Sequence, residues 1–543
     1  MSPLGRYIAS ICCWFATAAE FASHGARSAS NAAFLSSAII EKESEPMNRD
    51  LESLQETLER FILPRLRDVA AGWPFPLYLV GGVVRTFLMA GCSTKDRDVD
   101  LVTQGEIAAL AHRLADRLGG HVFPLNEGTW RIVFRADDRQ QWQLDISKLK
   151  GESIETDLSR RDFTINALAW EVGSREPRIL DPLRGRLDLE KRIIRCCSPQ
   201  CFWDDPLRLL RAIRFQAQLG FLISEETLQE MKERAPLLAG VSRERVRDEF
   251  FQILAAQSSW RHLQLLKELG LLEQVVPGVE AMYGLHQGVR HRLPLWEHSL
   301  ETVRALEALL PQLPCFIPSH GGYAESRLKM PLEGGIDIKL ALKLVALLHD
   351  LGKPFTRTVD DTGKVRFRGH EEEGRARIGE ICRSLRLGRK TKDWAEQLVG
   401  SHLRPVLLSA EEQWTRRAKF RFFRDLKDSG FDLLLLGWAD LQATVGEEDP
   451  QLLRYRSFFQ EMIEYYREDF MVQERGPLVR GNDLIREFGL RPGRKIGILL
   501  EKVREAQAEG RLETKEEALD LVRDQLARWS GVDEDGVQSG EEK

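Results

Sequence analysis

The sequence predicts an α+β fold, in which an N-terminal unit with a small mixed β-sheet and helices precedes a long all-helical region. Short strand-like apolar runs alternate with helical periodicity up to about residue 180, whereas helical periodicity dominates from residue 204 onward. With 543 residues the chain is long enough for three or more domains. Its content of 43% hydrophobic and 30% charged residues is ordinary for a soluble globular protein.

The N-terminal unit begins with a predicted helix over 48–63. Pro64 is expected to end or kink this helix, because proline lacks the backbone N–H and its ring clashes with the preceding turn. A second helix is expected over 105–118. Strands are expected at 77–80, 98–103, 131–135 and 142–146.

The remaining chain is predicted to be helical as far as residue 386 and beyond. Residues 311–336 interrupt the pattern with four prolines and four glycines, which predicts a loop or an insertion. Helices are expected at 205–219, 224–238, 243–256, 260–272, 296–310, 338–351 and 371–386.

Composition limits the compartment and the partners. The net charge of −5 gives no bulk attraction to nucleic acid, so RNA binding requires local basic patches, such as 183–195 and the aromatic-interleaved 415–428. A charged helix face is the alternative interpretation of both stretches. The eight cysteines include no paired C-x-x-C, which favours reduced thiols in a cytoplasmic protein. No apolar run reaches 18 residues, so no membrane span is predicted.

Residues 80–102 carry the strongest chemical signal. Asp98 and Asp100 stand two apart in a strand-like run, so their carboxylates project from the same face. Two converging carboxylates repel each other unless a cation lies between them. They follow a Gly81–Gly82 turn that can approach phosphate closely, and Asp145 on another strand offers a third carboxylate. This combination indicates a Mg²⁺-dependent nucleotidyl-transfer site rather than two solvated surface aspartates.

Two later segments carry groups suited to a nucleotide. In 158–170, Arg160 and Arg161 suit phosphate or ribose oxygens, and Asp162 and Asn166 are four apart on an expected helix. A helix cap by Asp162 is the structural alternative.

In 204–215, Asp205 and Arg208 are expected to share one helix face and to complement the edge of a cytosine or adenine base. A helix salt bridge is the other interpretation, and spacing alone does not separate the two.

These motifs resemble those of bacterial tRNA nucleotidyltransferases and poly(A) polymerases, the class II members of the polymerase-beta-like nucleotidyltransferase superfamily. The resemblance rests on GGVVR (81–85), DVD (98–100), RRDFTINA (160–167), DPLRG (181–185) and DDPLRLLRAIRF (204–215), in that order. It implies catalytic carboxylates at Asp98, Asp100 and Asp145, with Asp98 and Asp100 holding Mg²⁺. The implied nucleotide-binding residues are Gly81, Gly82, Arg85, Arg161, Asp162, Asn166, Asp205, Arg208, Arg211 and Arg214.

Three departures from the family pattern concern fine positioning. Thr86 stands where an aspartate is usual, Asp204 replaces a usual glutamate, and Ile-Ser-Lys-Leu-Lys follows Asp145 in place of a Thr-x-Arg segment. These departures leave open which nucleotides the enzyme adds, but they do not change the prediction that it is a transferase.

A second constellation lies downstream, where histidines and aspartates fall on successive predicted helices. Such residues are suitable ligands for a divalent transition metal. Their pattern resembles that of HD metal-dependent phosphohydrolases, over about 293–446. The resemblance implies that His298, His349, Asp350 and Asp440 bind metal, with His370 and His402 nearer a second ion or the phosphate. A purely structural HD fold is the alternative.

The predicted function is therefore a tRNA nucleotidyltransferase that adds CCA from CTP and ATP, with an HD phosphohydrolase activity. A poly(A) polymerase, a CC-adding or A-adding enzyme, and an HD phosphodiesterase with an RNA-binding head are the alternatives. The expected domains are an N-terminal extension (1–46, disordered or untranslated), the nucleotidyltransferase head (47–180), an all-α neck and body (181–290), an all-α HD domain (291–446), a helical tail (447–530) and an acidic disordered end (531–543).

Overall fold

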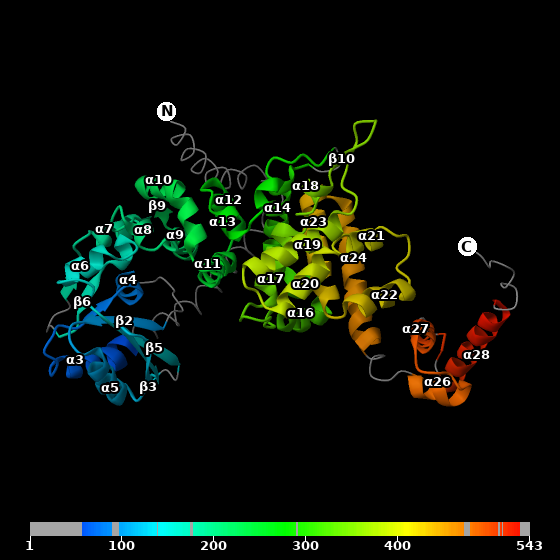
Figure 1. Ribbon diagram of the computed structural model, residues 1–543, viewed down its shortest axis with the longest axis horizontal. Helices are drawn as coiled ribbons and strands as arrows, with labels where there is room; N and C mark the ends of the chain where they lie inside the picture. The colour runs from blue at the N-terminus through cyan, green and yellow to red at the C-terminus, as the bar shows by residue number, and fades with distance from the viewer. Residues whose placement is uncertain are drawn as a thin grey trace, which may run out of the picture. The chain divides into compact units, whose positions relative to one another are not determined.

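The computed structural model describes two compact units (Figure 1). The first runs to Cys201 and takes in Phe221–Thr227, and the second holds Phe202–Gly220 and the chain from Leu228 onward. Within the described ranges, no helix combines the length and the apolar character needed to cross a bilayer. The expected extension 1–46 and nearly all of the acidic end lie outside those ranges. The described residues are 57–89, 97–137, 140–173, 178–288, 292–471, 478–508, 511–512 and 514–532.

A seven-stranded mixed sheet forms the centre of the first unit, which confirms the predicted class. The strand order is β3-β4-β5-β2-β1-β6-β7. Only β2 and β5 run parallel, and every other neighbouring pair is antiparallel. The strands are β1 (Tyr78–Val80), β2 (Asp98–Thr103), β3 (His121–Asn126), β4 (Thr129–Arg135), β5 (Gln141–Lys148), β6 (Ala169–Glu171) and β7 (Arg178–Leu180).

The sequence prediction missed three of these strands. β6 and β7 are three residues long, too short for period-two alternation to be recognised. β3 contains Pro124 and is mostly exposed, consistent with its place at the edge of the sheet.

Of the two outcomes predicted for Pro64, an end or a kink of the first helix, the end is wrong. A π-helical turn, η1 (Leu58–Ile62), runs directly into α3 (Leu63–Ala70), and Pro64 lies in the first turn of α3. The π-turn directly before Pro64 marks the place where the regular α-helical hydrogen-bond pattern changes. The predicted part before residue 57 lies outside the described residues. α5 (Ile107–Leu118) packs on the sheet and on α3 through a buried apolar stripe.

Short helices surround the sheet where the nucleotide motifs lie. They are α4 (Gly82–Leu88), α6 (Ile154–Ser159), the 3-10 turn η2 (Thr164–Asn166) and α7 (Gly185–Lys191). The expectation that Asp162 and Asn166 share an α-helix is therefore wrong, because α6 ends at Ser159. Buried Gly185 explains part of this local order, since a Cβ there would overlap the carbonyl oxygen of Thr164 in η2.

The second unit is helical, as predicted. Its core is built on α14, which packs against α17 and α23 (Figure 1). Ten of the fifteen residues of α14 are buried. The main helices are α9 (Arg208–Leu219), α10 (Glu225–Arg234, its start belonging to the first unit), α11 (Arg243–Ala255), α12 (Ser259–Glu268), α14 (Leu295–Leu309), α17 (Ile338–Leu348), α19 (His370–Ser384), α20 (Arg389–Val399), α21 (Leu403–Ser409), α22 (Arg416–Leu426), α23 (Ser429–Val445) and α24 (Pro450–Tyr465).

The segment 311–336 is not a simple loop. It holds the short helix α15 (Leu313–Phe316) and α16 (Gly321–Leu328), whose Ala324 and Leu328 are buried. Pro314 lies in the first turn of α15 and Gly321 begins α16, so residues that usually break helices here mark their starts.

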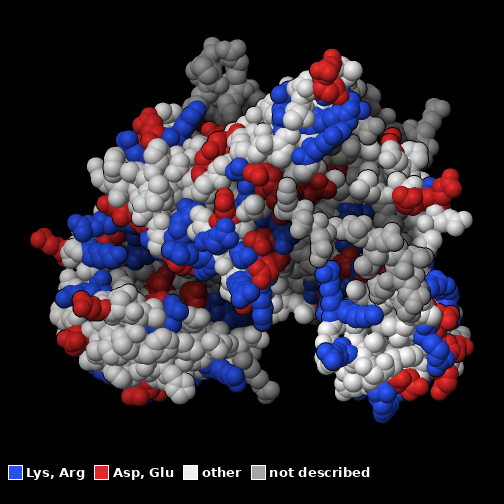
Figure 2. All heavy atoms as spheres, turned by 45° about the vertical axis from the view of Figure 1, so that its right-hand side comes forward, with Lys and Arg blue, Asp and Glu red and all other residues white. Residues whose placement is uncertain are grey.

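The aromatic and basic stretch 415–428 forms α22, and its residue types separate onto different faces. Phe422 and Phe423 are buried, so they are not available to stack on bases. Arg421 pairs with Glu505 of α27 (Arg494–Ala508) at 2.8 Å, and Arg424 pairs with Glu501 of the same helix. The structure thus favours the charged-face interpretation of this stretch. Positive and negative side chains are likewise interspersed over the face shown in Figure 2.

Candidate active sites and family

The carboxylates of the head converge on one face of the sheet. Asp98 and Asp100 are exposed on β2, while Val99 between them is buried, as the alternation of a strand requires. In the parallel pairing of β2 with β5, Asp100 lies directly opposite Asp145. Side chains at opposite positions of paired strands point to the same face. The structure therefore brings together the three carboxylates that the sequence predicted.

Arg131 is a fourth member of this face, and the sequence analysis missed it. It lies opposite Asp145 in the antiparallel pairing of β4 with β5. Its Nε and Nη2 atoms donate to both Asp145 carboxylate oxygens at 2.7 Å. This hydrogen bonding raises the pKa of Arg131, and Asp98 and Asp100 add to the effect. A bidentate pair of this kind fixes the Asp145 carboxylate in one orientation.

The Gly81–Gly82 turn adjoins the carboxylate face. Gly81 has a φ of 75°, in the region that favours glycine. A Cβ built there would lie 3.3 Å from Oδ2 of Asp100 and 3.5 Å from Nη1 of Arg161. The backbone of the turn is thus next to both an acidic and a basic group, and a larger residue would fill the space that a phosphate needs. This is a cradle that fits a Mg²⁺–triphosphate group.

Arg85, Asn166 and Asp162 form a buried hydrogen-bonded chain rather than an exposed set. Nη1 of Arg85 donates to the Asn166 side-chain oxygen, and Nδ2 of Asn166 donates to Oδ1 of Asp162 at 3.1 Å. Oδ1 of Asp162 also accepts the Phe163 backbone N–H at 2.8 Å. In this arrangement the three residues hold the turn of 160–167 against α4. Buried, paired polar groups of this kind fix one local conformation.

Arg161 is half-buried, and a buried carboxylate fixes the orientation of its guanidinium group. Its Nε and Nη2 atoms both donate to Oδ2 of buried Asp157 at 3.1 Å. Asp157 in turn accepts the backbone N–H of Lys150 at 3.0 Å. Since Nη1 is the Arg161 atom that lies 3.5 Å from the position of a Gly81 Cβ, the guanidinium group faces the glycine turn.

The base-reading pair is arranged differently from the expectation. Asp205 lies in the turn before α9, so it does not share a helix with Arg208. Its Oδ1 accepts the Leu207 N–H at 3.2 Å, and its Oδ2 pairs with Nη2 of Arg245 on α11 at 2.8 Å. Asp205 thus closes the turn that precedes α9 while staying partly exposed.

Arg211 and Arg214 both lie beside Glu249 of α11. Oε1 of this mostly buried carboxylate is 3.0 Å from Nη1 of Arg214 and 3.8 Å from Nη1 of Arg211. The pairs join α9 to α11 and give both arginines a structural role.

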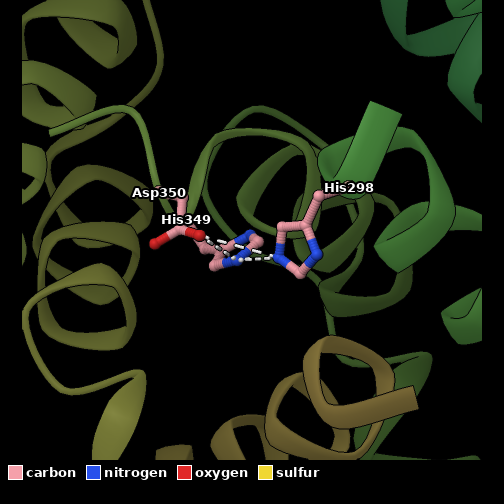
Figure 3. Close-up of side chains that lie close together, drawn as sticks. All are labelled: His298, His349 and Asp350. Atoms are coloured by element: carbon pink, nitrogen blue, oxygen red, sulfur yellow. Dashed lines mark hydrogen bonds and ion pairs between the residues drawn. The ribbon is translucent and has the colours of Figure 1, made fainter. Parts of the chain in front are cut away.

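The second constellation forms two adjoining groups of buried ligand atoms. His298, His349 and Asp350 make one group, and Asp350, His370 and His402 make the other. Within each group, the ligand atoms lie within 4.8 Å of one another. Figure 3 shows the first group, in which Nε2 of His298 and Nε2 of His349 are 3.3 Å apart. Asp350 contributes to both groups, as a carboxylate that bridges two ions does.

The predicted ligand Asp440 reaches the first group from α23. Its Oδ1 lies 3.1 Å from Nε2 of His298 and 3.6 Å from Nε2 of His349. The structure therefore brings all six predicted HD residues together, from helices α14, α19 and α23 and the turns that follow α17 and α20.

Three of the histidines share an orientation that suits metal binding. Nδ1 of His349, His370 and His402 each lies 2.7–2.9 Å from the backbone carbonyl three residues earlier. A neutral imidazole that donates from Nδ1 keeps the lone pair of Nε2 for a metal ion. Because the Nε2 atoms are the ones that cluster, the donor set fits a pair of divalent ions.

The side chains of this site polarise one another strongly. Burial lowers the pKa of His349, but Asp350 and Asp440 outweigh burial and raise it to about 10. Burial also disfavours the ionised form of Asp350, yet Lys353 and His349 hold its pKa well below the ordinary value. Buried charges of this kind require close partners, and a cation would serve as one.

Lys353 and Gln287 complete the surroundings of Asp350, and both were missed. Nζ of buried Lys353 lies 2.6 Å from Oδ2 of Asp350 and donates to Oε1 of Gln287 at 2.7 Å. Lys353 follows Asp350 by three residues, so its proximity could have been inferred from the HDLGK segment. Gln287 precedes α14 by eight positions, and nothing in the sequence indicated it.

Family models match most of the chain. The "Poly A polymerase head domain" matches residues 77–195, and the "Probable RNA and SrmB- binding site of polymerase A" matches 220–283. The HD domain matches 295–425, and domain 2 of tRNA nucleotidyltransferases matches 376–522.

Named relatives align over most of their own length. The A-adding tRNA nucleotidyltransferase of Deinococcus radiodurans is 34% identical over 84% of this chain and 96% of its own. The CC-adding tRNA nucleotidyltransferase of Thermus thermophilus is also 34% identical, with the same coverage. The multifunctional CCA protein of Neisseria gonorrhoeae is 31% identical over 60% of this chain and 73% of its own.

Solved structures share the fold. A CCA-adding enzyme in complex with CTP superposes with a TM-score of 0.61 at 21% identity, over 88% of this chain and 98% of that one. The Thermotoga maritima CCA-adding enzyme with tRNA gives a TM-score of 0.56 at 20% identity, with the same coverage. A carboxylate-bearing head, a helical body and an HD ligand set define a nucleotidyltransferase with an appended HD domain. More narrowly, the chain belongs to the tRNA nucleotidyltransferase and poly(A) polymerase family.

Proposed function

We propose that this enzyme adds nucleotides to the 3′ end of tRNA, using CTP and ATP to build CCA. The observation that carries the proposal is the face on which Asp98, Asp100 and Asp145 converge beside the Gly81 turn. The names of the full-length relatives support tRNA as the acceptor. We also propose the cytoplasm as its compartment, because tRNA and nucleoside triphosphates are found there.

Asp98 and Asp100 are the residues that would hold Mg²⁺. Bound there, Mg²⁺ would offset the charge that develops on the phosphate during transfer. Arg161, oriented by Asp157, would attract the triphosphate at the glycine turn. The 3′-hydroxyl oxygen of the RNA would bond to the α-phosphorus as the bond to pyrophosphate breaks, and Arg131 would hold the Asp145 carboxylate in one orientation throughout.

Asp205 and Arg208 are proposed to read the incoming base, with Asp205 accepting from an exocyclic amino group. To do so, Asp205 would exchange its contact with Arg245 for one with the base. Arg85, Asn166 and Asp162 would support the site indirectly, since the buried chain that they form holds the turn carrying Arg161.

We propose a second activity, the hydrolysis of phosphate esters at the HD site. The shared carboxylate Asp350 and the clustered Nε2 atoms of the histidines support a pair of divalent ions. A nitrogen-rich ligand set favours transition metals over Mg²⁺. Lys353 would place positive charge beside the shared carboxylate, where an anionic ester would also be attracted.

Extension of tRNA that ends at its discriminator base tests the main proposal. Purified protein with Mg²⁺ and both nucleotides is expected to add three residues, separated on a sequencing gel. A product two residues longer with CTP alone, unchanged when ATP is added, would indicate a CC-adding enzyme. Extension confined to tRNA that already ends in CC would indicate an A-adding enzyme, and a long ATP-dependent ladder a poly(A) polymerase.

The restricted activities form the second candidate function. Two relatives that align over 96% of their length each carry one half of the reaction, A addition or CC addition. The same gel decides between complete and partial addition, and failure to extend any of these RNAs would contradict both.

A further inference from the structure

We propose that Trp203 is a stacking platform for an unpaired base at the 3′ end of the RNA. This rests on the proposed function, and it assigns the RNA end a contact that the catalytic residues do not supply. Trp203 lies in the short helix α8 (Cys201–Asp204), directly before the predicted base-reading segment.

The exposure of Trp203 is unusual for its residue type. Its side chain is 57% exposed, and no other tryptophan in the described part of the chain is as exposed. Single exposed apolar residues are common and need no explanation by themselves. The exposure of Trp203 does call for an explanation, because Trp203 lies two residues before Asp205 and beside a cationic side chain.

A cation lies against the indole ring. The guanidinium carbon of Arg234, at the end of α10, is 5.0 Å from the ring centroid. The nearest acidic partners of Arg234 are 3.5 Å away on Glu230 and 3.9 Å away on Glu233, so its ion pairs are loose. An aromatic ring beside an arginine that is not tightly paired is the combination that single-stranded nucleic acid binds, since the ring stacks on bases and the guanidinium group attracts phosphate.

Further positive charge surrounds the same segment. Arg245 pairs with Asp205 while about half exposed, and Arg208 begins α9 immediately beyond. A protein with a net charge of −5 must use such local charge to hold RNA. A stacked base is therefore a better fit to Trp203 than a neutral apolar partner.

The test compares Trp203→Ala and Trp203→Phe in the full-length protein, with Trp260→Ala as the matched control. Trp260 lies on α12 of the same unit and carries an arginine, Arg261, at 5.1 Å from its ring, but it is less exposed. The dissociation constant of tRNA lacking CCA is measured at equilibrium without nucleotide. KM values for tRNA and for the nucleotide are measured separately.

Trp203→Ala is expected to weaken tRNA binding about 10-fold, the range of one lost base stack. The KM for the nucleotide should change less than about two-fold, and Trp203→Phe should restore most of the binding, because stacking needs only an aromatic face. A blunt-ended RNA helix without unpaired 3′ bases should bind the wild type and Trp203→Ala equally.

Unchanged tRNA binding by Trp203→Ala would overturn the proposal, as would an equal loss in Trp260→Ala. A change confined to the KM for the nucleotide would do so too, because the stacked base would then belong to the incoming nucleotide. Binding is measured without turnover, so an absence of incorporation by the wild type would contradict the proposed function while leaving this comparison intact.

Discussion

The two candidate metal sites of this protein differ in how exposed their ligand residues are. In the head, Asp98 and Asp100 are exposed on a strand and lie beside a glycine turn. In the helical unit, His298, His349 and Asp350 are almost fully buried, and their ligand atoms lie close together. An exposed carboxylate pair tolerates the absence of its ion, because water screens the charges. A buried set depends on a cation or on its own ion pairs.

The difference fits what each proposed activity would require of its site. A nucleotidyl-transfer site receives a triphosphate and an RNA end together, so its ligands must face open space. A hydrolytic site acts on one ester and benefits from a preorganised, water-poor setting. Helix packing assembles the second candidate site, whereas a strand and its neighbours carry the first.

Removing the exposed carboxylates should separate the two activities most strongly. Asp98→Ala combined with Asp100→Ala is expected to lower the rate of nucleotide incorporation by about 10³-fold or more, because the charge of the transition state loses several kcal/mol of stabilisation. Hydrolysis of bis(p-nitrophenyl) phosphate at the HD site should be unchanged. Asp116→Ala, which removes an exposed aspartate from α5, is the control. Incorporation that survived the double substitution would contradict the assignment of these carboxylates.

Replacing the shared carboxylate should have the converse result. Asp350→Asn removes a ligand from both groups and is expected to weaken metal binding by more than about 10²-fold, together with hydrolysis. Asp440→Asn and His370→Ala each touch one group, so each should halve the metal content rather than abolish it. Metal per chain is measured by mass spectrometry, with tRNA extension as the test of intact folding. Equal loss in all three variants would show that the two groups do not bind separate ions.

The exposed carboxylate site of the head should depend on the buried packing of the turn at 160–168. Gly185→Ala forces a Cβ into the Thr164 carbonyl and is expected to destabilise the head by about 1–3 kcal/mol. Hydrogen exchange of residues 160–168 should accelerate, and tRNA extension at elevated temperature should fall while hydrolysis persists. Gly173→Ala, where a Cβ would meet nothing closer than 3.9 Å, is the matched control. Equal protection in the two variants would refute this packing argument.

The smallest effect is expected at Arg131. Arg131→Gln removes the bidentate contact to Asp145, a partly exposed pair worth about 1 kcal/mol, so incorporation should fall roughly 3- to 10-fold. Arg135→Gln, an exposed arginine at the end of the same strand, should leave the rate unchanged. If Arg131→Gln had no effect on the rate, orientation of Asp145 would not matter to the reaction.

Much of both sites could be predicted from the sequence, because local geometry sets it. The two-residue spacing of Asp98 and Asp100 placed both on one face of a strand, since side chains alternate along any strand. The glycines at 81 and 82 indicated a turn that a side chain would block. His349 and Asp350 are adjacent, so they were bound to reach the same region.

Several predictions failed in segments that are too short to show the sequence periodicity of a helix or a strand. Asp162 and Asn166 were expected on one α-helix, but the chain turns after α6 and they meet through a hydrogen bond instead. Asp205 was expected within a helix and in fact precedes one. Pro64 was expected to end or kink a helix; the chain stays helical through it, and a π-turn lies directly before α3.

By itself, the sequence determined which residue types carry the chemistry and which of them share a local face. Only the tertiary structure decided that Asp100 faces Asp145, that Arg131 holds Asp145, and that Asp350 serves two groups of histidines. The physical reason is the range of the interactions. Alternation along a strand is fixed by neighbouring residues, whereas strand register and helix packing are fixed by contacts between segments far apart in the chain.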